Sequence, residues 1–468
     1  LMISFIGQGS VEQAISIAEV YKDNGNLSQI SQMILSAKLI KDGRTEDFLS
    51  FIKDASEITP ILKDLLSAWT LMGLGDEVNA NRIFDKTSNV QGMGQFANFH
   101  RAMSQLAAGK FDQSLKTFNL IHGDKGNPTR RSVISHTKIL LSQSKFKEAQ
   151  SLLEKWFGPT FDPEIEELFV QATNEKVYPK TSFSNINIAV ADVFYSIANL
   201  IRKEADPTFT LIYSRLAEYL DANHVDSILM TADLLVELEQ YNLAIKEHEK
   251  LSNSQPQYFA SELGRAEALR SSGKEDAAIE VLAALTHQFP NSANGFSILG
   301  NHYRRLEFYD RAEIAYNEAI KLYQAKGDVG WFLYYVRGIT RERLNLWDLA
   351  EKDFRKALSL NPTQPQVLNY LGYSLIEKNT NLDEALDMIE RAVKESPDSG
   401  YIVDSLGWGY YKLGEYEKAV PNLERAAELM PIDPIVNDHL GDVYWMVGRK
   451  TEAEFQWRRA LSFDPEEE

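Results

Sequence analysis

Apolar and small residues return along the C-terminal half of the chain at a step of 34 residues. The last copy of the pattern contains a Leu-Gly pair, a tyrosine and two alanines, at Leu440-Gly441, Tyr444, Ala453 and Ala460. The copy before it has the same residue types 34 positions earlier, at Leu406-Gly407, Tyr410, Ala419 and Ala426. Three further copies precede these two. A pattern of this length predicts a repeated unit of two helices joined by a tight turn.

The residue types at the repeated positions have a packing explanation. Glycine and alanine permit the two helices of a unit to approach closely, and large aromatic residues such as Tyr316 and Phe354 fill the space beside them. Gly414 and Gly448 fall in turns, where glycine can adopt the left-handed conformation that ends a helix. Prolines such as Pro465 follow the second helix, which they cannot extend. One hairpin cannot bury its apolar face alone, so we expect neighbouring hairpins to stack.

With this spacing, the small, aromatic and proline positions resemble the tetratricopeptide repeat. The resemblance covers Phe194–Pro465 well and the N-terminal third poorly. It implies an all-α fold, a right-handed superhelical solenoid of about twelve helical hairpins. It also implies that the first helices of the hairpins line the inner surface, where proteins of this family commonly bind their ligands.

One break in phase divides the chain. Thr137 and Ala198 are 61 residues apart, which is 27 more than one repeat. We therefore expect a degenerate N-terminal solenoid over 1–157, an inserted linker with a short helix over 158–186, and a C-terminal solenoid over 187–468. The short helix is predicted at Glu164–Thr173. The alternative is that the insertion is a degenerate repeat, and the sequence does not say whether it is functional. A smaller insertion, Gln324–Gly330, predicts a longer loop.

A stripe of residues on the first helices, spaced by four and then three or four, is expected to face the groove. It consists of aromatic, amide and charged side chains, at Arg304, Arg305, Tyr335, Arg343, Asn369, Tyr373, Ile376, Asp404, Trp408, Tyr411, Asp438, Asp442 and Trp445. Aromatic rings can stack on side chains of a peptide, and amides and carboxylates can bond its backbone. The stripe predicts a peptide-binding groove. The alternative is that Trp408, Tyr411 and Trp445 pack against each other or against a terminal helix.

The stripe is basic at its upstream end and acidic at its downstream end. Such a polarity could orient a partner that has acidic and basic ends. The competing interpretation is that these charges pair within the groove. The C-terminal Glu466–Glu468 run is interpreted as a solvated, frayed end.

Composition narrows the classes of partner. The chain has 49 Lys and Arg against 67 Asp and Glu, a formal net charge of −18, and this excess disfavours nucleic acid and anionic membranes. It contains no cysteine, which excludes thiolate zinc sites and a cysteine nucleophile. We expect no integral membrane segment, because no apolar run approaches 20 residues. The start at Leu1 resembles a cut end, so a removed export signal is possible, and the oligomeric state is open.

No catalytic pattern rises above background, so the sequence predicts a protein that is not an enzyme and has no cofactor or metal. The eight histidines form no His-Glu-x-x-His pair. His439 and Asp442 are one helical turn apart, but a histidine paired with a nearby carboxylate explains them better than a metal ion.

The C-terminal half also resembles a narrower group, tetratricopeptide proteins of the alphaproteobacterial type. The similarity lies in runs such as Gly400–Trp408, Asn437–Trp445 and Phe455–Arg459. It implies a bacterial protein, with the periplasm or cell envelope favoured over the cytoplasm. Two functions follow: a scaffold that binds a protein or peptide, or a non-catalytic regulatory subunit of a cell-envelope assembly enzyme.

Overall fold

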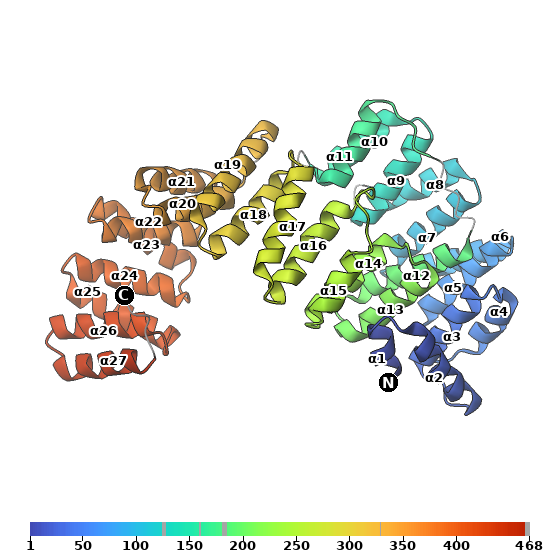
Figure 1. Cartoon of the computed structure of the whole chain (residues 1–468), viewed down its shortest axis with the longest axis horizontal. Helices are drawn as coiled ribbons and strands as arrows, with labels where there is room; N and C mark the ends of the chain where they lie inside the picture. Colours follow the sequence, from blue (N-terminus) through green and yellow to red (C-terminus); the bar gives the residue numbers. More distant parts are fainter. Residues whose placement is uncertain (124–127, 159–160, 180–184, 328, 464–468) are drawn as a thin grey trace. The chain divides into compact units, whose positions relative to one another are not determined.

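The computed structural model describes residues 1–123, 128–158, 161–179, 185–327 and 329–463 (Figure 1). Over these residues the chain forms 27 α-helices and no β-strand. The all-α prediction is therefore confirmed. With α11 set apart, the helices make thirteen consecutive pairs, close to the predicted twelve hairpins. Pro465 and the Glu466–Glu468 run lie outside the described residues.

Contacts divide the chain into two compact units, which we call unit 1 (Leu1–Gly295) and unit 2 (Phe296–Glu468). The helices of unit 1 are α1 (Met2–Gly7), α2 (Val11–Asp23), α3 (Gln29–Lys41), α4 (Thr45–Asp54), α5 (Pro60–Gly73), α6 (Glu77–Ser88), α7 (Gly94–Ala107), α8 (Phe111–Ile121), α9 (Arg130–Ser142), α10 (Phe146–Phe157), α11 (Pro163–Thr173), α12 (Ile186–Ile201), α13 (Pro207–Leu220), α14 (Val225–Glu237), α15 (Tyr241–His248), α16 (Tyr258–Ser271) and α17 (Glu275–Gln288).

Helix α18 (Ala293–Arg305) begins in unit 1 and ends in unit 2. The other helices of unit 2 are α19 (Tyr309–Lys326), α20 (Trp331–Arg343), α21 (Trp347–Leu360), α22 (Pro365–Glu377), α23 (Leu382–Glu395), α24 (Gly400–Lys412), α25 (Tyr416–Leu429), α26 (Pro434–Met446) and α27 (Lys450–Ser462). The predicted domain boundaries near residues 157 and 186 stay a prediction, since the compact units meet at a different point in the sequence.

Glycine at the helix crossings is explained by the second helix of the same hairpin. A Cβ atom added at Gly338 would lie 2.6 Å from the Phe354 ring, and one added at Gly300 would lie 2.7 Å from the Tyr316 ring. At Gly407 the added atom would lie 2.5 Å from the Leu423 side chain, one helical turn beyond Ala419. Real Cβ atoms do not approach other atoms so closely. The predicted pairing of small and large residues is therefore confirmed at these crossings.

The hairpin turns use the left-handed backbone region. Gly414 and Gly448 have φ values of 76° and 83°, as the sequence predicted. Several other turns place a non-glycine residue in the same region, including Glu239 with φ of 58° and Glu307 with φ of 61°. Side chains with a Cβ atom are strained there, so these turns are held by the packing of the helices on either side.

The two insertions are partly helical. In the first, α11 begins at Pro163, one residue before the predicted helix, and packs against α9 and α10. Residues 159–160 and 180–184 of that segment lie outside the described residues. In the second, α19 continues to Lys326 and ends at Gly327, whose φ is 80°. The first residues of the predicted long loop therefore extend a helix.

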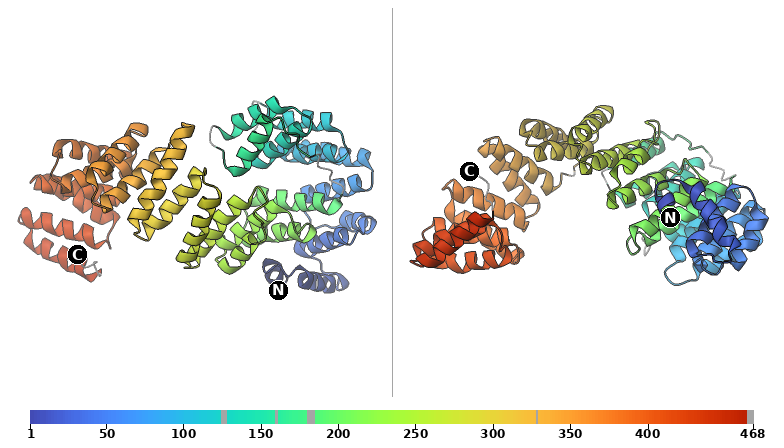
Figure 2. Two further views of the ribbon diagram at one scale, coloured as in Figure 1. Left: turned by 45° about the horizontal axis from the view of Figure 1, so that its top comes forward. Right: turned by 60° about the horizontal axis from the view of Figure 1, so that its bottom comes forward.

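In unit 1 the hairpin α12–α13 packs against the first helices of the N-terminal hairpins. Helix α5 contacts α12, and helices α1 and α3 contact α13 (Figures 1 and 2). Polar bonds join the same elements, since Lys41 donates to the Leu220 carbonyl at 3.1 Å and Arg215 donates to the Gly7 carbonyl at 3.1 Å. The concave side of the N-terminal hairpins is thus occupied by another part of the same chain.

The composition of α12 explains why it lies there. Every residue of Ala189–Phe194 is buried, and six consecutive residues cover the whole circumference of a helix. A helix that is apolar all round is stable only when protein surrounds it. The one charged residue among them, Asp192, is paired with Arg131 on α9 and lies 3.4 Å from His224 Nε2.

Unit 2 is a simpler row of hairpins. The main contacts of each helix from α20 to α27 are with the next one or two helices along the chain. Its core combines the repeated alanines and the aromatic residues Tyr316 and Phe354, which are fully buried, with leucine, isoleucine and valine side chains. Among the helices of the described residues, none is both long and apolar enough to cross a membrane.

Candidate functional site

The first helices of unit 2 form a pocket of about 470 Å³, which we call the unit 2 pocket. Its lining comes from α20, α22, α24 and α26 and from Lys378, which directly follows α22. The lining residues are Glu342, Arg343, Asn369, Tyr370, Tyr373, Ser374, Glu377, Lys378, Tyr401, Asp404, Ser405, Ile435 and His439. The second helices contribute none of these, so the pocket faces the side on which the first helices lie.

Helical periodicity places the lining residues on one stripe. On α22, Asn369, Tyr373 and Glu377 follow one another at intervals of four, one above the next along the same face. Proline at the first position of α22 and of α26 fixes where each helix begins. The carboxylate of Asp433 also accepts a hydrogen bond from the Val436 amide and caps α26.

A buried polar contact joins two first helices, α24 and α26, at the pocket. The Nδ1 atom of His439 on α26 lies 3.0 Å from Oδ2 of Asp404 on α24, and both side chains are nine-tenths buried. The Trp408 ring stacks on the His439 ring with centroids 3.9 Å apart and on the Tyr411 ring at 4.7 Å. Trp408 Nε1 donates to Glu377 at 2.8 Å. This cluster fixes the positions of α22, α24 and α26 relative to one another.

Hydrogen-bonding groups remain available in the pocket. The Oδ1 atom of Asn369 is buried and accepts no hydrogen bond from the residues that the structure describes. Burial, with smaller contributions from Glu377 and Asp404, raises the pKa of Tyr373 to about 12, so its hydroxyl stays protonated at neutral pH. Two exposed apolar residues form a rim beside these groups. Tyr401 is 66% exposed and Ile435 is 62% exposed.

Four of the predicted groove residues line this pocket: Arg343, Asn369, Tyr373 and Asp404. Trp408 and Tyr411 lie next to it, in the stack with His439. Ile376, in contrast, is 3% exposed, and the structure corrects its expected groove position. It lies on the same face of α22 as Asn369, but α24 covers it, because its side chain packs beside Gly409 of that helix.

The remaining predicted residues are not in the pocket lining. Tyr335 packs in an aromatic cluster, edge to face with Tyr370 at 6.0 Å. Trp445 lies 5.6 Å from the Trp457 ring, and Asp442 accepts a hydrogen bond from Trp457 Nε1 at 3.1 Å. The others are on α18 and α26, at Arg304, Arg305 and Asp438. The structure therefore brings together the middle of the predicted stripe and leaves its two ends outside this pocket.

Sequence reasoning missed the apolar rim. Tyr401 and Ile435 occupy the same position in successive repeats, 34 residues apart and three residues before Asp404 and Asp438. A pair of large apolar residues at the repeat step, away from the helix crossings, was the available signal. It was hard to interpret because large apolar residues in repeats are more often part of the core.

The preferred interpretation of His439, a histidine paired with a nearby carboxylate, agrees with the geometry. The carboxylate is that of Asp404 in the preceding repeat. Within the described part of the chain, no group of three or more His, Asp or Glu side chains is placed to hold a metal ion.

Comparisons with known proteins agree with the repeat. The tetratricopeptide repeat model matches residues 229–293, 335–400 and 405–467. A TPR repeat-containing protein of Pseudomonas aeruginosa is 29% identical over 163 residues, which are 35% of this chain and 27% of that protein. A lipoprotein NlpI homolog of Haemophilus influenzae is 39% identical over 90 residues, 19% of this chain and 27% of that protein. The chain thus aligns with only about a quarter of the length of either relative.

Solved structures give distant matches. The crystal structure of the APC/C hetero-tetramer Cut9–Hcn1 matches 94% of this chain and 95% of its own, with 15% identity and a TM-score of 0.43. A tetratricopeptide repeat protein from Parabacteroides merdae matches 52% of this chain and 94% of its own, with 16% identity and a TM-score of 0.43.

The resemblance to alphaproteobacterial proteins stays a prediction, since neither of the relatives above supports it. The broader resemblance is shown by three kinds of observation: the 34-residue step, the close approach of glycine and aromatic residues at the helix crossings, and the three segments matched by the repeat model. The chain contains tetratricopeptide repeats over the three segments that the repeat model matches.

Proposed function

We propose that unit 2 is a protein-interaction module that binds an extended peptide segment of a partner in the unit 2 pocket. The observation that carries this proposal is the pocket itself, because its 470 Å³ combine an apolar rim, a buried amide and charges of both signs on four successive first helices. Most ligand sites in proteins combine an apolar lining with a few well-placed polar groups in this way. Tetratricopeptide repeats serve generally in protein interaction. The proposal adds the kind of partner, an extended peptide segment, and the pocket that binds it.

The polar groups fit a peptide backbone. The Asn369 Oδ1 atom, which accepts no hydrogen bond within the described chain, can accept one from a backbone amide of the ligand. The protonated Tyr373 hydroxyl can donate to a backbone carbonyl. A buried polar atom without a partner is costly, so a ligand that satisfies Asn369 gains the energy that the free protein lacks.

The rim fits an apolar side chain. Tyr401 and Ile435 stand exposed at the mouth of the pocket, where burial by a ligand removes apolar surface from water. Arg343 and Lys378 lie at the side of the pocket formed by α20 and α22, with Glu342 and Glu377 beside them. The lining is close to neutral, which favours an uncharged or mixed peptide over a nucleic acid.

We assign Trp408 and Tyr411 to positioning and not to ligand contact. The Trp408 ring is stacked on the Tyr411 ring and on the His439 ring, and Trp408 also bonds Glu377. This arrangement corresponds to the packing interpretation of these aromatic residues. In the proposal they hold α22, α24 and α26 at the spacing that forms the pocket, and the chain acts by binding without catalysing a reaction.

The proposal is tested by selecting peptides and then changing the pocket. Peptides of twelve residues are selected from a random displayed library on the full chain, and their affinities are measured by fluorescence anisotropy. For a peptide held in the unit 2 pocket, Asn369→Ala and Tyr401→Ala should each weaken binding by about ten-fold, since central contacts of this kind cost more than about 1.4 kcal/mol.

A matched control is Asn422→Ala on the second helix α25. The Asn422 amide bonds only the Lys418 carbonyl of its own helix, outside the pocket. The control should leave the affinity unchanged. If every selected peptide binds the Asn369→Ala and Tyr401→Ala chains as tightly as the wild type, the unit 2 pocket is not a peptide site.

A second candidate function is a non-catalytic regulatory subunit of a cell-envelope assembly enzyme. It is favoured by the name of one relative, a lipoprotein of Haemophilus influenzae, although the alignment covers 19% of this chain. Cross-linking in cells of the source organism separates the candidates. Recovery of one envelope enzyme in a fixed ratio supports the regulatory subunit, and recovery of several unrelated clients supports the scaffold.

A further inference from the structure

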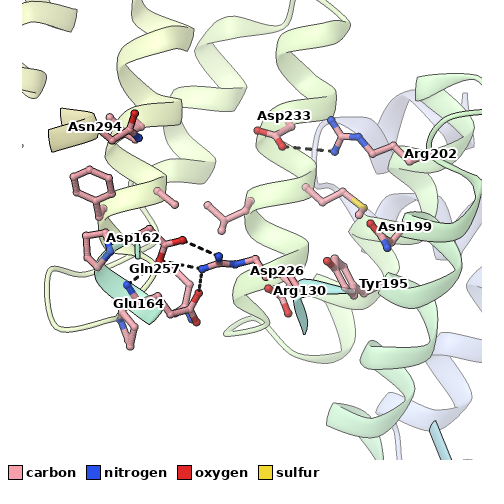
Figure 3. Close-up of a pocket in the computed structure, with 17 residues that line it drawn as sticks. Arg130, Asp162, Glu164, Tyr195, Asn199, Arg202, Asp226, Asp233, Gln257 and Asn294 are labelled. Atoms are coloured by element: carbon pink, nitrogen blue, oxygen red, sulfur yellow. Dashed lines mark hydrogen bonds and ion pairs between the residues drawn. The ribbon is translucent and has the colours of Figure 1, made fainter. Parts of the chain in front are cut away.

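Unit 1 contains a second pocket, of about 510 Å³, which we call the unit 1 pocket (Figure 3). One wall is made by Arg130 at the start of α9 and by the first residues of α11. The rest of the lining comes from α12, α14 and α16, from residues that directly flank α12 and α16, and from Asn294 on α18. The inserted helix α11, whose role the sequence left open, therefore forms part of a ligand-sized cavity.

The wall contributed by α11 is fixed by charged contacts. The guanidinium of Arg130 pairs with Asp162 at 2.7 Å and with Glu164 at 2.8 Å. Asp162 also caps α11 by accepting hydrogen bonds from the Glu164 and Ile165 amides. Gln257, directly before α16, donates to Glu164, whose side chain is 11% exposed. These contacts tie α9, α11 and the residue before α16 into one frame, which Figure 3 shows around Arg130.

Helix α14 presents a stripe of two carboxylates with apolar residues in the middle. Asp226 and Asp233 are seven residues apart, which places them on the same face, about 10 Å from each other along the helix axis. Leu229 and Met230 lie in the middle of this stripe and also line the pocket. The side chain of Asp226 is 39% exposed and that of Asp233 is 56% exposed.

The charges of this pocket are unequal. Four carboxylates and two guanidinium groups line it. Arg130 already has two acidic partners, and Arg202 contacts Glu237 at 2.7 Å and Asp233 at 3.6 Å. The basic groups are therefore satisfied, whereas Asp226 makes one ion pair, with Arg131 at 3.1 Å. Asp226 and Asp233 retain oxygen atoms that can accept further hydrogen bonds from a cation.

Two amides complete the site. The side chains of Asn199 on α12 and Asn294 on α18 line the pocket, and both residues are exposed. Figure 3 shows them in different parts of the pocket, with the α14 stripe in view. Side-chain amides can bond both the amide and the carbonyl groups of a peptide backbone.

We propose that the unit 1 pocket binds a peptide segment that carries two basic side chains three residues apart, with an apolar side chain at a position between them. In a polyproline-II conformation, residues three apart lie on the same side and about 9 Å from each other, close to the separation of Asp226 and Asp233. The basic groups pair with the two carboxylates, and the apolar side chain lies on Leu229 and Met230.

This site is independent of the function proposed for unit 2. None of its lining residues belongs to unit 2, so a substitution here leaves the unit 2 pocket intact, and the reverse also holds. A chain with both sites can hold two segments at once, one mixed or uncharged and one basic.

The test uses the full chain and fluorescein-labelled peptides of nine residues. One peptide has lysines three apart with leucine in the middle, a second has glutamate in place of both lysines, and a third has the two lysines adjacent. The first should bind, and the second should not. The third should bind about ten-fold more weakly than the first, since its lysines reach one carboxylate at a time.

The protein variant is Asp226→Asn with Asp233→Asn, which keeps the shape of both side chains. It should weaken binding of the first peptide by about ten-fold or more, because each lost pair is a charge-assisted hydrogen bond. The matched control is Asp276→Asn with Asp348→Asn, which removes the same charge from exposed first turns of α17 and α21. The control should bind as the wild type does.

Three results would overturn the proposal. Equal weakening by the two double variants would mean that the net charge of the chain attracts any basic peptide. Equal affinity for the first and third peptides would remove the spacing argument. Displacement of the first peptide by spermidine at equal concentration would mean that the pocket recognises a small polycation and not a peptide. Asn369→Ala should change none of these affinities, which keeps a failure here distinct from a failure of the unit 2 proposal.

Discussion

Units 1 and 2 are built from the same kind of hairpin but differ in what lies against their first helices. In unit 1, the first helices α1, α3 and α5 pack against the hairpin α12–α13. In unit 2, the first helices α20, α22, α24 and α26 line a pocket of about 470 Å³. One repeat design thus yields a concave side that its own chain fills at the N-terminal hairpins of unit 1 and one available to a ligand in unit 2.

The difference follows from the side chains on the helix that faces inward. Helix α12 buries Ala189, Val190, Val193 and Phe194 in successive directions, so protein must surround it. The stripe of Asn369, Tyr373 and Glu377 on α22 has hydrogen-bonding groups that remain stable when facing water. A first helix therefore enters a core or forms a groove according to whether its exposed stripe is apolar or polar.

The largest expected effect is that of acid on unit 1. Burial lowers the pKa of His100 and His136 to about 3 and that of His122, His224 and His248 to about 4, with Arg131 contributing at His100 and His224. The unfolded chain binds these protons near pH 6.5, so stability falls as the pH drops from 6.5 toward 4. At pH 5 each histidine lowers the free energy of unfolding by about 2 kcal/mol relative to neutral pH.

Two carboxyl groups of unit 1 act in the opposite sense. Burial raises the pKa of Glu218, and partial desolvation raises the pKa of the more exposed Asp233, and this favours the folded state as the pH falls. Five histidines outweigh two carboxyl groups, so unit 1 should lose stability first. Hydrogen exchange measured helix by helix at pH 7.5 and pH 5 checks this, with intrinsic exchange rates corrected for pH. Equal loss of protection in α12 and α22 would contradict it.

Asp192→Ala should be the most damaging single substitution in the comparison. Asp192 is 4% exposed, pairs with Arg131, and lies near His224 and His100. Its removal leaves a largely buried guanidinium without this partner, which typically costs about 3–5 kcal/mol. Hydrogen exchange should show lower protection in α9 and α12 and no change in α24. Protection lost in both units would mean that they do not unfold separately.

Ala419→Leu should destabilise unit 2 by about 1–3 kcal/mol. Ala419 is fully buried on α25, one turn from the Leu423 side chain that packs on Gly407. A larger side chain there pushes α24 and α25 apart. Thermal unfolding followed by circular dichroism measures the effect, and Glu417→Leu on the same helix serves as an exposed control. An unchanged melting temperature for Ala419→Leu would contradict the assigned helix crossing.

The smallest effect is expected at the turns, and it should be the same in both units. Glu239 in unit 1 and Glu307 in unit 2 have φ values of 58° and 61°. Glycine adopts this conformation without strain, so Glu239→Gly and Glu307→Gly should each stabilise the chain by about 1 kcal/mol. Denaturant unfolding compares the two. A gain in one unit only would show that the turns are held differently.

The sequence predicted the repeat well because its determinants are local. The glycines at the crossings meet residues of the same hairpin, such as Tyr316 and Phe354, only 16 positions later. The filled concave side of unit 1 could not be predicted in this way. It depends on contacts such as that of Arg215 with Gly7, which are 208 residues apart and follow no repeat period.

The candidate site was predicted in part. Asn369, Tyr373 and Asp404 line one pocket, and helical spacing is what let the sequence group them on one stripe. The ends of the stripe, at Arg304 and Trp445, lie outside the pocket because the direction of each helix relative to the next is set by packing. Stacking of Trp408 on His439 is an example, since it joins two repeats through side chains that no spacing rule connects.

The most direct test compares solvent access to the first helices of the two units. Because the chain has no cysteine, Val190→Cys on α12 and Tyr373→Cys on α22 each introduce a single thiol for labelling. The account predicts that the thiol of the Tyr373→Cys chain reacts on the timescale of a free thiol. That of the Val190→Cys chain should react about a hundred-fold or more slowly, through local unfolding. Similar rates for the two chains would contradict the central claim that one concave side is filled and the other is open.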